Sequence, residues 1–357
     1  MPIPRNNPRK RAPTLADVGR AAGVSAMAVS AVLNGASSSV RISEETQKRI
    51  RKAAKELNYR PNIAARALVN RRMNTLGVFF VVEDHELNNY FLAVFNGIID
   101  AASKYQQNVT VFTLDTWSDA KSQLEKAFDG RIDGMILIAP VVTAEFASGL
   151  DPNIPAVSLH ANAEVDGMIN IESDERTGAR EMVELLLRKG HRRVMHLSGP
   201  RGLIGVERRI DGYREALQAQ GVKPEEKLLV STDYSEEGGR SKMRAWLKKN
   251  QGLDLPDAIF CANDSIALGC IEALAEAGIR VPDDVSVCGF DDTLIARATV
   301  PQLTTVRQPL KAMGAEAVDI LMKRISNGED AIKDLGKVVV HPTVLVERSS
   351  VRDLSAS

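Results

Sequence analysis

The sequence contains none of the common short patterns of an enzyme active site. No Gly-x-Ser-x-Gly elbow, Walker loop or His-Glu-x-x-His pattern occurs, and the five histidines are scattered without metal-ligand spacing. Gly199, Gly202 and Gly205 precede a predicted helix, which fits either an anion cradle or an ordinary loop-to-helix turn, but their spacing matches neither phosphate fingerprint. We therefore predict no catalytic residues, no cofactor and no metal, although an enzyme is the main rival among functions.

Cysteine and long apolar runs are also scarce. Cys261, Cys270 and Cys288 are odd in number and occupy predicted strand or helix positions, which fits reduced core thiols in the cytoplasm. The amino terminus, residues 1–5, lacks the apolar run of a signal sequence, and no stretch is long enough to span a membrane. We predict a cytoplasmic protein without membrane contact. An exported sugar-binding protein without DNA function is the second rival.

Although the chain has no net charge, its basic and acidic residues are distributed unevenly along the sequence. Residues 1–72 hold 15 Lys and Arg against 4 Asp and Glu, a balance of +11, and the remainder of the chain has a balance of −11. A basic segment of this kind is typical of a surface that displaces counterions from phosphate. The first basic groups, Arg5, Arg9, Lys10 and Arg11, fit a solvated tail over residues 1–13.

Helix-capping residues follow this tail. Thr14 can accept a hydrogen bond at the start of a helix over 15–22, and Asp17 lies in its first turn. Gly23 allows a tight turn, and a second helix then runs from Ser25 to Asn34. Two helices joined by so short a turn predict a helix-turn-helix.

Ser43 begins a third helix. Its apolar residues recur at helical spacing and can cover the first two helices: Ile50, Ala53, Ala54 and Leu57. Residues 14–60 therefore form a predicted DNA-binding domain, with an ordinary three-helix bundle as the alternative.

The order and spacing of these motifs resemble the LacI family of bacterial transcription regulators over nearly the whole chain. The resemblance is carried by Thr14-Leu-Ala-Asp17, Ala21-Ala-Gly-Val-Ser25, Val32-Leu-Asn-Gly35, Asn58-Tyr-Arg-Pro-Asn62 and Ala65-Arg-Ala-Leu68. It implies that the second helix enters the major groove of double-stranded operator DNA. It also implies that residues 61–72 contain a hinge helix, capped by Asn62, that forms when two subunits meet on the operator.

By the same resemblance, Leu68 would enter the minor groove as an apolar wedge that kinks the duplex. An ordinary linker with one buried leucine is the alternative. The full set of DNA-binding residues that we predict is Thr14, Ser25, Ala26, Met27, Ser30, Asn34, Arg41, Tyr59, Asn62, Arg66 and Leu68.

The predicted recognition helix departs from the family. Small or apolar residues stand where the family often carries longer or more polar ones: Ala26, Met27, Ala28 and Ala31. Such groups can contact a thymine methyl but cannot form the paired hydrogen bonds that read guanine, worth about 1–3 kcal/mol each. We expect specificity to depend on DNA shape and on the kink. Arg41, in a long serine-rich loop, either reaches a phosphate or is a solvated loop charge.

Beyond residue 72 the chain is long enough for two lobes. Apolar runs without alternation, such as 76–82, 135–138 and 258–261, predict strands buried on both faces, and amphipathic helices intervene, such as 206–220 and 310–325. The predicted fold class is α/β, with a small all-α helix-turn-helix head before two doubly wound parallel-sheet lobes. The family resemblance implies a core like that of periplasmic binding proteins.

In that fold the chain crosses between the lobes three times. We place the crossings near residues 171–174, 292–303 and 330–337. Lobe 1 would then hold 75–172 and 303–332, and lobe 2 would hold 173–300 and 333–350, including a last strand at 338–340. The tail at 351–357 has no leucine heptad, so a homodimer is expected rather than a tetramer.

Several residues match the family's effector-binding positions and suit a small polar ligand. The predicted set is Tyr90, Phe91, His160, Arg209, Tyr234, Asn263 and Asp291. Arg209 can hold two hydroxyls or a carboxylate, Asp291 can accept from neighbouring sugar hydroxyls, and Tyr234 can stack on an apolar ligand face.

Each of these residues also has a structural interpretation. Arg209 fits a surface ion pair, Asn263 a helix cap, Tyr234 a core position and His160 a capping or buried histidine. Tyr90 and Phe91 fit packing at a helix start, and Asp292 fits a structural role beside Asp291. His160 stands where relatives often have an acidic ligand contact.

The sequence therefore predicts a cytoplasmic homodimeric repressor that binds operator DNA. Its DNA affinity would change when a small molecule binds between the lobes. The hydroxyl-binding groups favour a sugar or sugar derivative over a purine.

Overall fold

The computed structural model describes residues 11–34, 42–60, 72–82, 87–117, 120–252 and 254–355. The chain divides into two compact units, residues 1–73 and 74–357, which we describe separately as the head and the core. Four predicted DNA contacts, Arg41, Asn62, Arg66 and Leu68, lie outside the described residues, as do residues 61–71 of the hinge predicted at 61–72.

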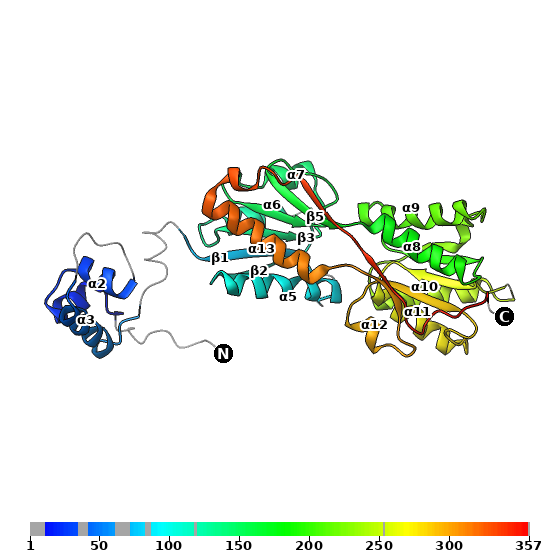
Figure 1. The fold of residues 1–357 in the computed structure, drawn as a ribbon, viewed down its shortest axis with the longest axis horizontal. Coiled ribbons are helices and arrows are strands. Elements are labelled where there is room, and N and C mark those ends of the chain that lie inside the picture. The colour runs from blue at the N-terminus through cyan, green and yellow to red at the C-terminus, as the bar shows by residue number, and fades with distance from the viewer. Residues whose placement is uncertain are drawn as a thin grey trace, which may run out of the picture. The chain divides into compact units, whose positions relative to one another are not determined.

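The head contains three helices, α1 (Leu15–Ala22), α2 (Ala26–Asn34) and α3 (Glu44–Glu56) (Figure 1). Thr14 and Asp17 form a capping box at α1, because the Asp17 amide donates to Thr14 Oγ1 at 3.3 Å and the Thr14 amide donates to Asp17 Oδ2 at 2.9 Å. The helices share a small apolar core of Val18, Ala22, Val29, Ile50, Ala53 and Ala54.

Lobe 1 of the core begins with alternating strands and helices. They are β1 (Thr75–Val81), α5 (Asn89–Lys104), β2 (Asn108–Leu114), α6 (Ala120–Ala127), β3 (Gly134–Ile138), α7 (Ala144–Ser148), β4 (Ala156–Leu159) and β5 (Met168–Ser173). The six-stranded sheet has the order β11-β5-β4-β3-β1-β2 and is parallel throughout.

Lobe 2 continues the alternation. Its elements are α8 (Glu175–Arg188), β6 (Val194–Ser198), α9 (Ile204–Ala219), a 3-10 turn (Glu226–Leu228), β7 (Leu229–Ser231), α10 (Glu236–Lys249), β8 (Ala258–Cys261), α11 (Asp264–Glu276), β9 (Ser286–Asp291), α12 (Leu294–Ala298) and β10 (Thr304–Arg307). Its sheet has the order β12-β10-β9-β8-β6-β7, and only β12 (Val344–Val346) is antiparallel to its neighbour. The predicted α/β class with parallel-sheet lobes is confirmed.

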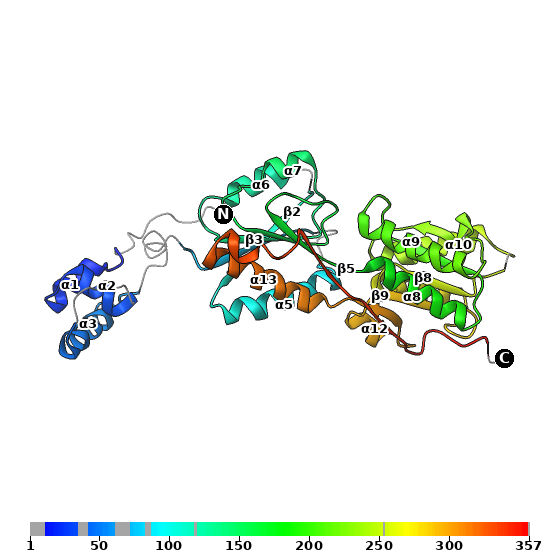
Figure 2. The ribbon, with the colours of Figure 1, turned by 45° about the horizontal axis from the view of Figure 1, so that its top comes forward.

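Helices cover both faces of each sheet, which is why the strands read as continuous apolar runs. In lobe 1, α5 and α13 (Leu310–Asn327) cover one face and α6 and α7 cover the other (Figure 2). Successive residues of β1 alternate between these layers: Val78 packs with α5 and α13, and Phe79 packs with α6. In lobe 2, α8 and α9 lie on one face and α10 and α11 on the other.

Helices α5 and α13 approach closely at two glycines. A Cβ on Gly97 would lie 1.9 Å from the carbonyl oxygen of Lys311, and one on Gly314 would lie 2.2 Å from that of Val94. No larger residue fits at either position without separating the helices. This contact fixes α5, the helix that carries Tyr90, on the face of lobe 1.

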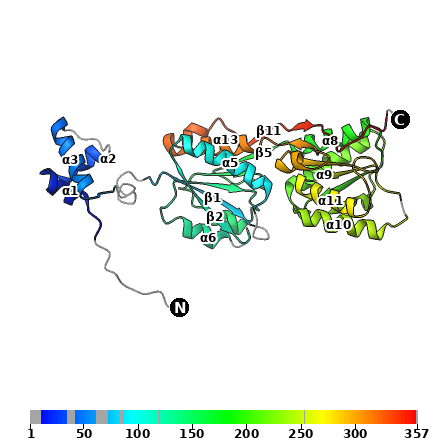
Figure 3. The same ribbon diagram turned by 90° about the horizontal axis from the view of Figure 1, so that it is seen from below.

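Two of the three crossings lie later than the sequence predicted. The segment at 304–307 is strand β10 of lobe 2, parallel to β9, so the chain returns to lobe 1 at 308–309. The strand predicted for lobe 2 at 338–340 is β11 (Val338–His341) of lobe 1, parallel to β5, so the last crossing is at 342–343. The first crossing follows β5 at Asp174. The two lobes are therefore joined by three adjacent segments, of which the one after β11 is visible in Figure 3.

The wrong assignments have a physical reason. Strands β10 and β11 are four residues long, and their sheet is decided by pairing with residues distant in sequence. No local pattern distinguishes the two sheets for so short a strand.

Across the described ranges, no single helix is long and apolar enough to cross a membrane. Helices α1 and α2 reach the required composition only as a pair, which is bent by 103°. Their apolar residues pack against α3.

Candidate functional site

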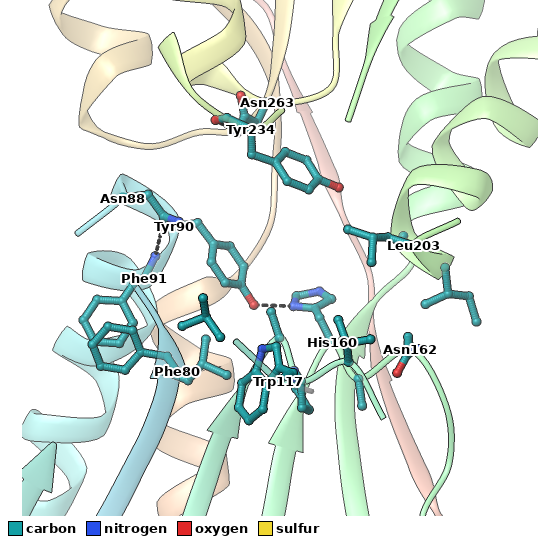
Figure 4. Close-up of a pocket in the computed structure, with 18 of the residues that line it drawn as sticks. Phe80, Asn88, Tyr90, Phe91, Trp117, His160, Asn162, Leu203, Tyr234 and Asn263 are labelled. Carbon is teal, nitrogen blue, oxygen red and sulfur yellow. Dashed lines mark hydrogen bonds between the residues drawn. The ribbon is translucent and has the colours of Figure 1, made fainter. Parts of the chain in front are cut away.

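A cavity of about 600 Å³ lies between the two lobes, at the carboxyl ends of strands from both sheets. Ligands of open α/β sheets bind at these ends because the loops there converge on one space. Lobe 1 contributes residues after β1 to β4 and at the end of β5. Lobe 2 contributes residues after β6, β7 and β8 and at the end of β9. We call this cavity the cleft (Figure 4).

On the lobe 1 side, Tyr90 and His160 meet across the floor of the cleft. Tyr90 lies in the first turn of α5, and its hydroxyl is 2.7 Å from His160 Nδ1 (Figure 4). His160 directly follows β4, and its Nε2 is 3.3 Å from the backbone nitrogen of Ser173. Burial lowers the pKa of His160 to about 4, so its ring is neutral at pH 7.

Phe91, the neighbour of Tyr90, belongs mainly to the apolar core. Its ring stacks on Phe80 with a centroid distance of 3.8 Å, and the residue is 4% exposed. Asn88 caps α5 by accepting from the Phe91 amide at 2.8 Å. Packing at the helix start therefore accounts for Phe91, although the residue also borders the cleft.

On the lobe 2 side, Arg209 lines the cleft but is already bonded to the protein. Its Nη2 donates to Glu175 Oε1 at 2.6 Å, and its Nη1 donates to the carbonyl oxygen of Ala262. The guanidinium lies over the Phe290 ring at 4.3 Å. Burial alone would lower the pKa of Arg209, but the combined attraction of Glu175, Tyr234 and Asp291 and the hydrogen bond to Glu175 raise it above its ordinary value, so the guanidinium stays charged.

Asn263 combines the two roles that the sequence suggested. Its side-chain oxygen accepts from the Ile266 amide at 2.7 Å and so caps α11, while its Nδ2 donates to the backbone carbonyl of Tyr234 at 3.0 Å. Both Asn263 and Tyr234 line the cleft, and the Tyr234 ring extends into it (Figure 4).

Asp291 ends β9 and faces the cleft with 5% exposure. Gln308 Nε2 donates to its Oδ1 at 2.6 Å. Burial raises the pKa of Asp291 above the ordinary value, and the nearby Arg209 opposes that rise. The adjacent Asp292 is held by Arg307 and Arg348 at 2.6 and 2.5 Å, as expected for a structural residue.

Residues with strained backbone conformations are concentrated around the cleft. Seven non-glycine residues have positive φ in the described part of the chain, and four of them lie at strand ends beside the cleft: Ala139, His160, Asp291 and Asp292. Such conformations cost on the order of 1–3 kcal/mol each and are typical of functional sites.

The sequence did not identify several residues that shape the cleft. Trp117 follows β2 and packs edge-on against Phe146, and Arg208 forms an ion pair with Glu172 at 3.0 Å. Glu175 starts α8 and Trp117 follows an edge strand, and neither position has a distinctive local pattern. Their place at the cleft depends on the tertiary fold.

Gly199 and Gly205 leave room for neighbouring side chains, whereas Gly202 has a positive φ of 89° and a Cβ there would meet nothing within 4 Å. A Cβ on Gly199 would lie 2.6 Å from the Tyr234 ring, and one on Gly205 would lie 2.6 Å from Glu175 Oε2. The space beside Gly205, at the start of α9, thus holds a carboxylate of the chain itself. These contacts favour the loop-to-helix interpretation.

In the head, the outer surface of α2 is accessible. Ser25, which caps α2 through the Ala28 amide at 3.2 Å, is exposed together with Ala26, and Met27 has 80% exposure. Thr14 is the cap of α1, Ser30 is partly buried, and Asn34 ends α2. Tyr59 packs against the head core, so a structural role explains it without DNA.

Two family models match the chain. The model described as "Bacterial regulatory proteins, lacI family" matches residues 14–62, and the model "Periplasmic binding protein-like domain" matches residues 183–351. The first covers the three helices of the head. The second covers most of lobe 2 and the part of lobe 1 that contains α13 and β11.

Curated relatives match over nearly their full length. The transcriptional repressor PurR of Vibrio atlanticus (strain LGP32) is 32% identical over 352 residues, which cover 96% of this chain and 99% of the relative. The probable transcriptional repressor ExuR of Bacillus subtilis (strain 168) is 30% identical over 345 residues, covering 96% and 99%.

Solved structures show the same architecture. A lac repressor dimer bound to operator and the anti-inducer ONPF has a TM-score of 0.82 at 26% identity, covering 96% of this chain and 100% of that one. The transcriptional regulator CelR in complex with cellobiose has a TM-score of 0.68 at 28% identity, covering 95% and 99%. The chain therefore belongs to the LacI family of bacterial transcription regulators, and its head is a DNA-binding domain.

Proposed function

We propose that the chain is a cytoplasmic repressor whose affinity for operator DNA is controlled by an uncharged sugar bound in the cleft. One observation carries this proposal: a single chain joins a helix-turn-helix head to a cleft lined by hydrogen-bonding groups of both lobes. The relatives named above are transcription regulators, which supports action by binding rather than catalysis. Both of these curated relatives are called repressors, as is the lac repressor, which has the same fold.

The charges around the cleft support an uncharged ligand. The described residues that line it include four carboxylates, Asp115, Glu172, Glu175 and Asp291, and two guanidinium groups, Arg208 and Arg209. Each guanidinium is paired with a lining carboxylate, Arg208 with Glu172 and Arg209 with Glu175. The lining therefore has a net negative charge. A phosphate or carboxylate ligand would be repelled and would have to displace a buried ion pair.

The remaining groups suit a sugar. Asp291 offers an acceptor, Asn162 offers the donors of its amide nitrogen because its oxygen accepts from the Val142 amide, Tyr90 and Tyr234 offer hydroxyls, and Trp117 contributes an aromatic surface. Alternating hydroxyls and apolar ring faces of a sugar match such a mixture of polar groups and aromatic rings. A cavity of about 600 Å³ lies within the range of small-molecule sites, and CelR, which has this fold, binds cellobiose.

A second copy of the chain fits the exposed apolar face of lobe 1. Leu92 and Ile99 lie two turns apart on α5 with 41% and 44% exposure, and Val111 of the neighbouring edge strand β2 has 42% exposure. Such a stripe is typical of an interface, and the lac repressor structure with this fold is a dimer. We infer a homodimer whose two heads bind two half-sites of a partly symmetric operator.

The three crossing segments provide the coupling between ligand and DNA. Because they are adjacent, the lobes can close on a ligand by a small change at 174, 308–309 and 342–343. Closure would alter the separation of the two hinge segments, residues 61–72 of each subunit, and thereby whether they form paired helices on DNA. By linkage, sugar and operator then change each other's affinity by the same factor.

A thermal-shift titration of the full chain tests the ligand class. Cellobiose, glucose, glucose 6-phosphate and hypoxanthine are compared at equal concentrations. At 100 times its Kd a ligand stabilises the folded chain by about 2.7 kcal/mol, so a neutral sugar should raise Tm by several degrees. The R209A variant should lose that shift. The R176A variant, which breaks a surface pair between Arg176 and Glu215, should retain it.

A larger shift with glucose 6-phosphate or hypoxanthine than with either sugar would contradict the proposed ligand class. A shift that R209A retains in full would remove Arg209 from the site.

A further inference from the structure

Two consecutive arginines of α9 form ion pairs of different kinds. Arg209 is paired with Glu175, and both residues are buried within lobe 2. Arg208 is paired with Glu172 of β5, with Nη1 and Oε1 3.0 Å apart. Strand β5 belongs to the lobe 1 sheet, and Arg208 and Glu172 both line the cleft. This second ion pair therefore joins the two lobes across the wall of the cleft.

The carboxylate of Glu172 is fixed in place by lobe 1. Asn170 Nδ2 donates to Glu172 Oε2 at 3.1 Å, while Arg208 contacts Oε1. The side-chain oxygen of Asn170 in turn accepts from the Ser158 hydroxyl and from the Ala161 amide, each at 3.0 Å. These residues belong to β4, to β5 and to the loop after β4. The position of the carboxylate thus depends on lobe 1 and not on Arg208.

The guanidinium of Arg208 is less constrained than its partner. The Arg208 side chain is 31% exposed, against 8% for Glu172, and within the described part of the chain it has no further hydrogen bond or ion pair. Without Arg208, the buried Glu172 would keep one amide donor and no cation, which is costly for a carboxylate. Without the charge of Glu172, Arg208 would still be in contact with water. Glu172 therefore depends on Arg208 more than Arg208 depends on Glu172.

The ion pair lies beside the crossing segments but is not part of them. Ser173, which follows Glu172, donates from Oγ to Gln308 Oε1, and this bond joins the ends of β5 and β10 next to two crossings. Such a bond can persist when the lobes rotate about the crossings. Arg208 reaches β5 from the second turn of α9, so movement of α9 away from lobe 1 would break its ion pair.

We propose that Arg208 and Glu172 form a latch that stabilises the closed arrangement of the lobes and thereby strengthens ligand binding in the cleft. Closure brings Arg208 to a carboxylate that is already in place, and only the closed arrangement gives the buried carboxylate its counter-charge. A ligand bound by groups of both lobes favours the same arrangement. The inference rests on the proposed function in assuming that the cleft binds a sugar, but the effect on the lobes needs no ligand.

The first experiment measures the lobes of the full chain without a ligand. Dyes are attached through E145C on α7 and E237C on α10, two exposed positions that follow the carboxyl ends of β3 and β7 at the cleft. The three native cysteines are buried. Labelled chains are diluted into an excess of unlabelled chains, so that energy transfer between the dyes occurs within one chain.

We expect R208Q to lower the efficiency of energy transfer, because opening of the cleft separates the dyes. E172Q should lower it in the same direction but by less. The control is R176Q, which breaks a surface pair between Arg176 and Glu215 within lobe 2 and should leave the efficiency unchanged. The same distribution of efficiencies in R208Q, E172Q and the wild type overturns the latch.

The second experiment is a calorimetric titration with cellobiose, or with glucose if only glucose shifts Tm. It compares the wild type with R208Q, E172Q and the double variant. We expect R208Q to bind at least about tenfold more weakly than the wild type, because closure then buries an unpaired carboxylate. E172Q leaves the arginine in contact with water and should lose about threefold.

The double variant separates a latch from a direct ligand contact. Removing the charge of Glu172 from R208Q removes the cost of burying it, so the double variant should bind at least about threefold more tightly than R208Q. A direct contact between Arg208 and the ligand would give no such recovery. A double variant that binds as weakly as R208Q, or more weakly, overturns the latch.

Operator affinity provides a test of sign. If the latch and the sugar favour the same arrangement, loss of the latch must change operator affinity in the direction opposite to the change caused by the sugar. A duplex selected by the full chain from a random library is titrated with the wild type, with and without sugar, and with R208Q alone. A change in the same direction as that caused by the sugar, or no change in R208Q, overturns the latch.

Failure of the latch and failure of the proposed function are distinguishable. If neither sugar binds the wild type, the proposed ligand class is wrong, while energy transfer in the ligand-free chain still decides whether the latch holds the lobes. If a sugar binds and R208Q has the same energy transfer as the wild type, the proposed function stands and the latch is wrong.

Discussion

Arg209 and Glu175 form a buried ion pair in the wall of the cleft, with Nη2 and Oε1 2.6 Å apart and side chains 7% and 4% exposed. The pair joins α9 to the first turn of α8, on the lobe 2 side of the first crossing. The guanidinium is therefore held in place by the protein before any ligand arrives.

Removing the charge of Glu175 should destabilise the core strongly. The E175Q variant leaves the Arg209 cation buried without a full counter-charge, a change that typically costs about 3–5 kcal/mol. Urea unfolding followed by tryptophan fluorescence measures the loss, since Trp117 reports on lobe 1 and Trp246 on lobe 2. The control is E215Q, whose partner Arg176 is 58% exposed, and its cost should stay below about 1 kcal/mol. Similar losses in both variants would mean that burial does not distinguish the pairs.

Leu68 provides a test of the DNA-binding mode inferred from the sequence. If it enters the minor groove, L68A should weaken operator binding by at least about tenfold, because the kink brings further protein surface onto the DNA. Binding to random duplex should change little, because phosphate contacts dominate there. Anisotropy titrations at matched salt compare the two duplexes. Equal losses on both would exclude the wedge.

The capping box of α1 should stabilise the head. T14A removes the hydroxyl that accepts from the Asp17 amide and should cost about 1 kcal/mol, whereas T14S keeps the acceptor and should cost much less. Hydrogen exchange of α1 amides in the full chain measures both. Exchange as slow in T14A as in the wild type would show that packing alone holds the helix start.

His196 should make the core less stable in acid. Its ring stacks between Tyr213 and Phe260, its Nδ1 bonds to the Phe260 carbonyl at 2.8 Å, and burial lowers its pKa to about 4. The folded chain then binds fewer protons than the unfolded chain, whose histidine pKa is near 6.5, so this contribution is complete above that pH. It is lost as pH falls towards 4, by up to about 3 kcal/mol.

H196F keeps an aromatic ring in the stack and removes the titration. The urea midpoint of the wild type should therefore fall relative to that of H196F between pH 6.5 and pH 4. Above pH 7 the difference between the two midpoints should stay constant. A difference that does not vary with pH would show that His196 charges freely in the folded core.

Local signals predicted most of the architecture. The Thr14 and Asp17 capping pattern fixed the first helix at residues 15–22, as found, and apolar runs located strands such as β1 and β8. The crossings were misplaced because the sheet of β10 and of β11 is chosen by distant partners. The residues of such a short strand do not by themselves indicate which sheet the strand joins.

The site was predictable only where a residue belongs to a family motif. The structure brings Arg209, Asn263 and Asp291 together at the cleft, as the resemblance implied. Ser173 and Gln308 were missed because their role depends on the crossings that bring strands β5 and β10 together. Glu175 was missed because it meets Arg209 from a different helix.

The central claim is that the cleft controls sequence-specific DNA binding by the head. Selection of duplexes from a random library by the full chain, with and without cellobiose and glucose, tests it most directly. We predict enrichment of a partly palindromic sequence with two half-sites, to an extent that the sugars change by about 5–150-fold in affinity. Enrichment of no sequence, or of one sequence to the same extent with and without the sugars, would contradict the account.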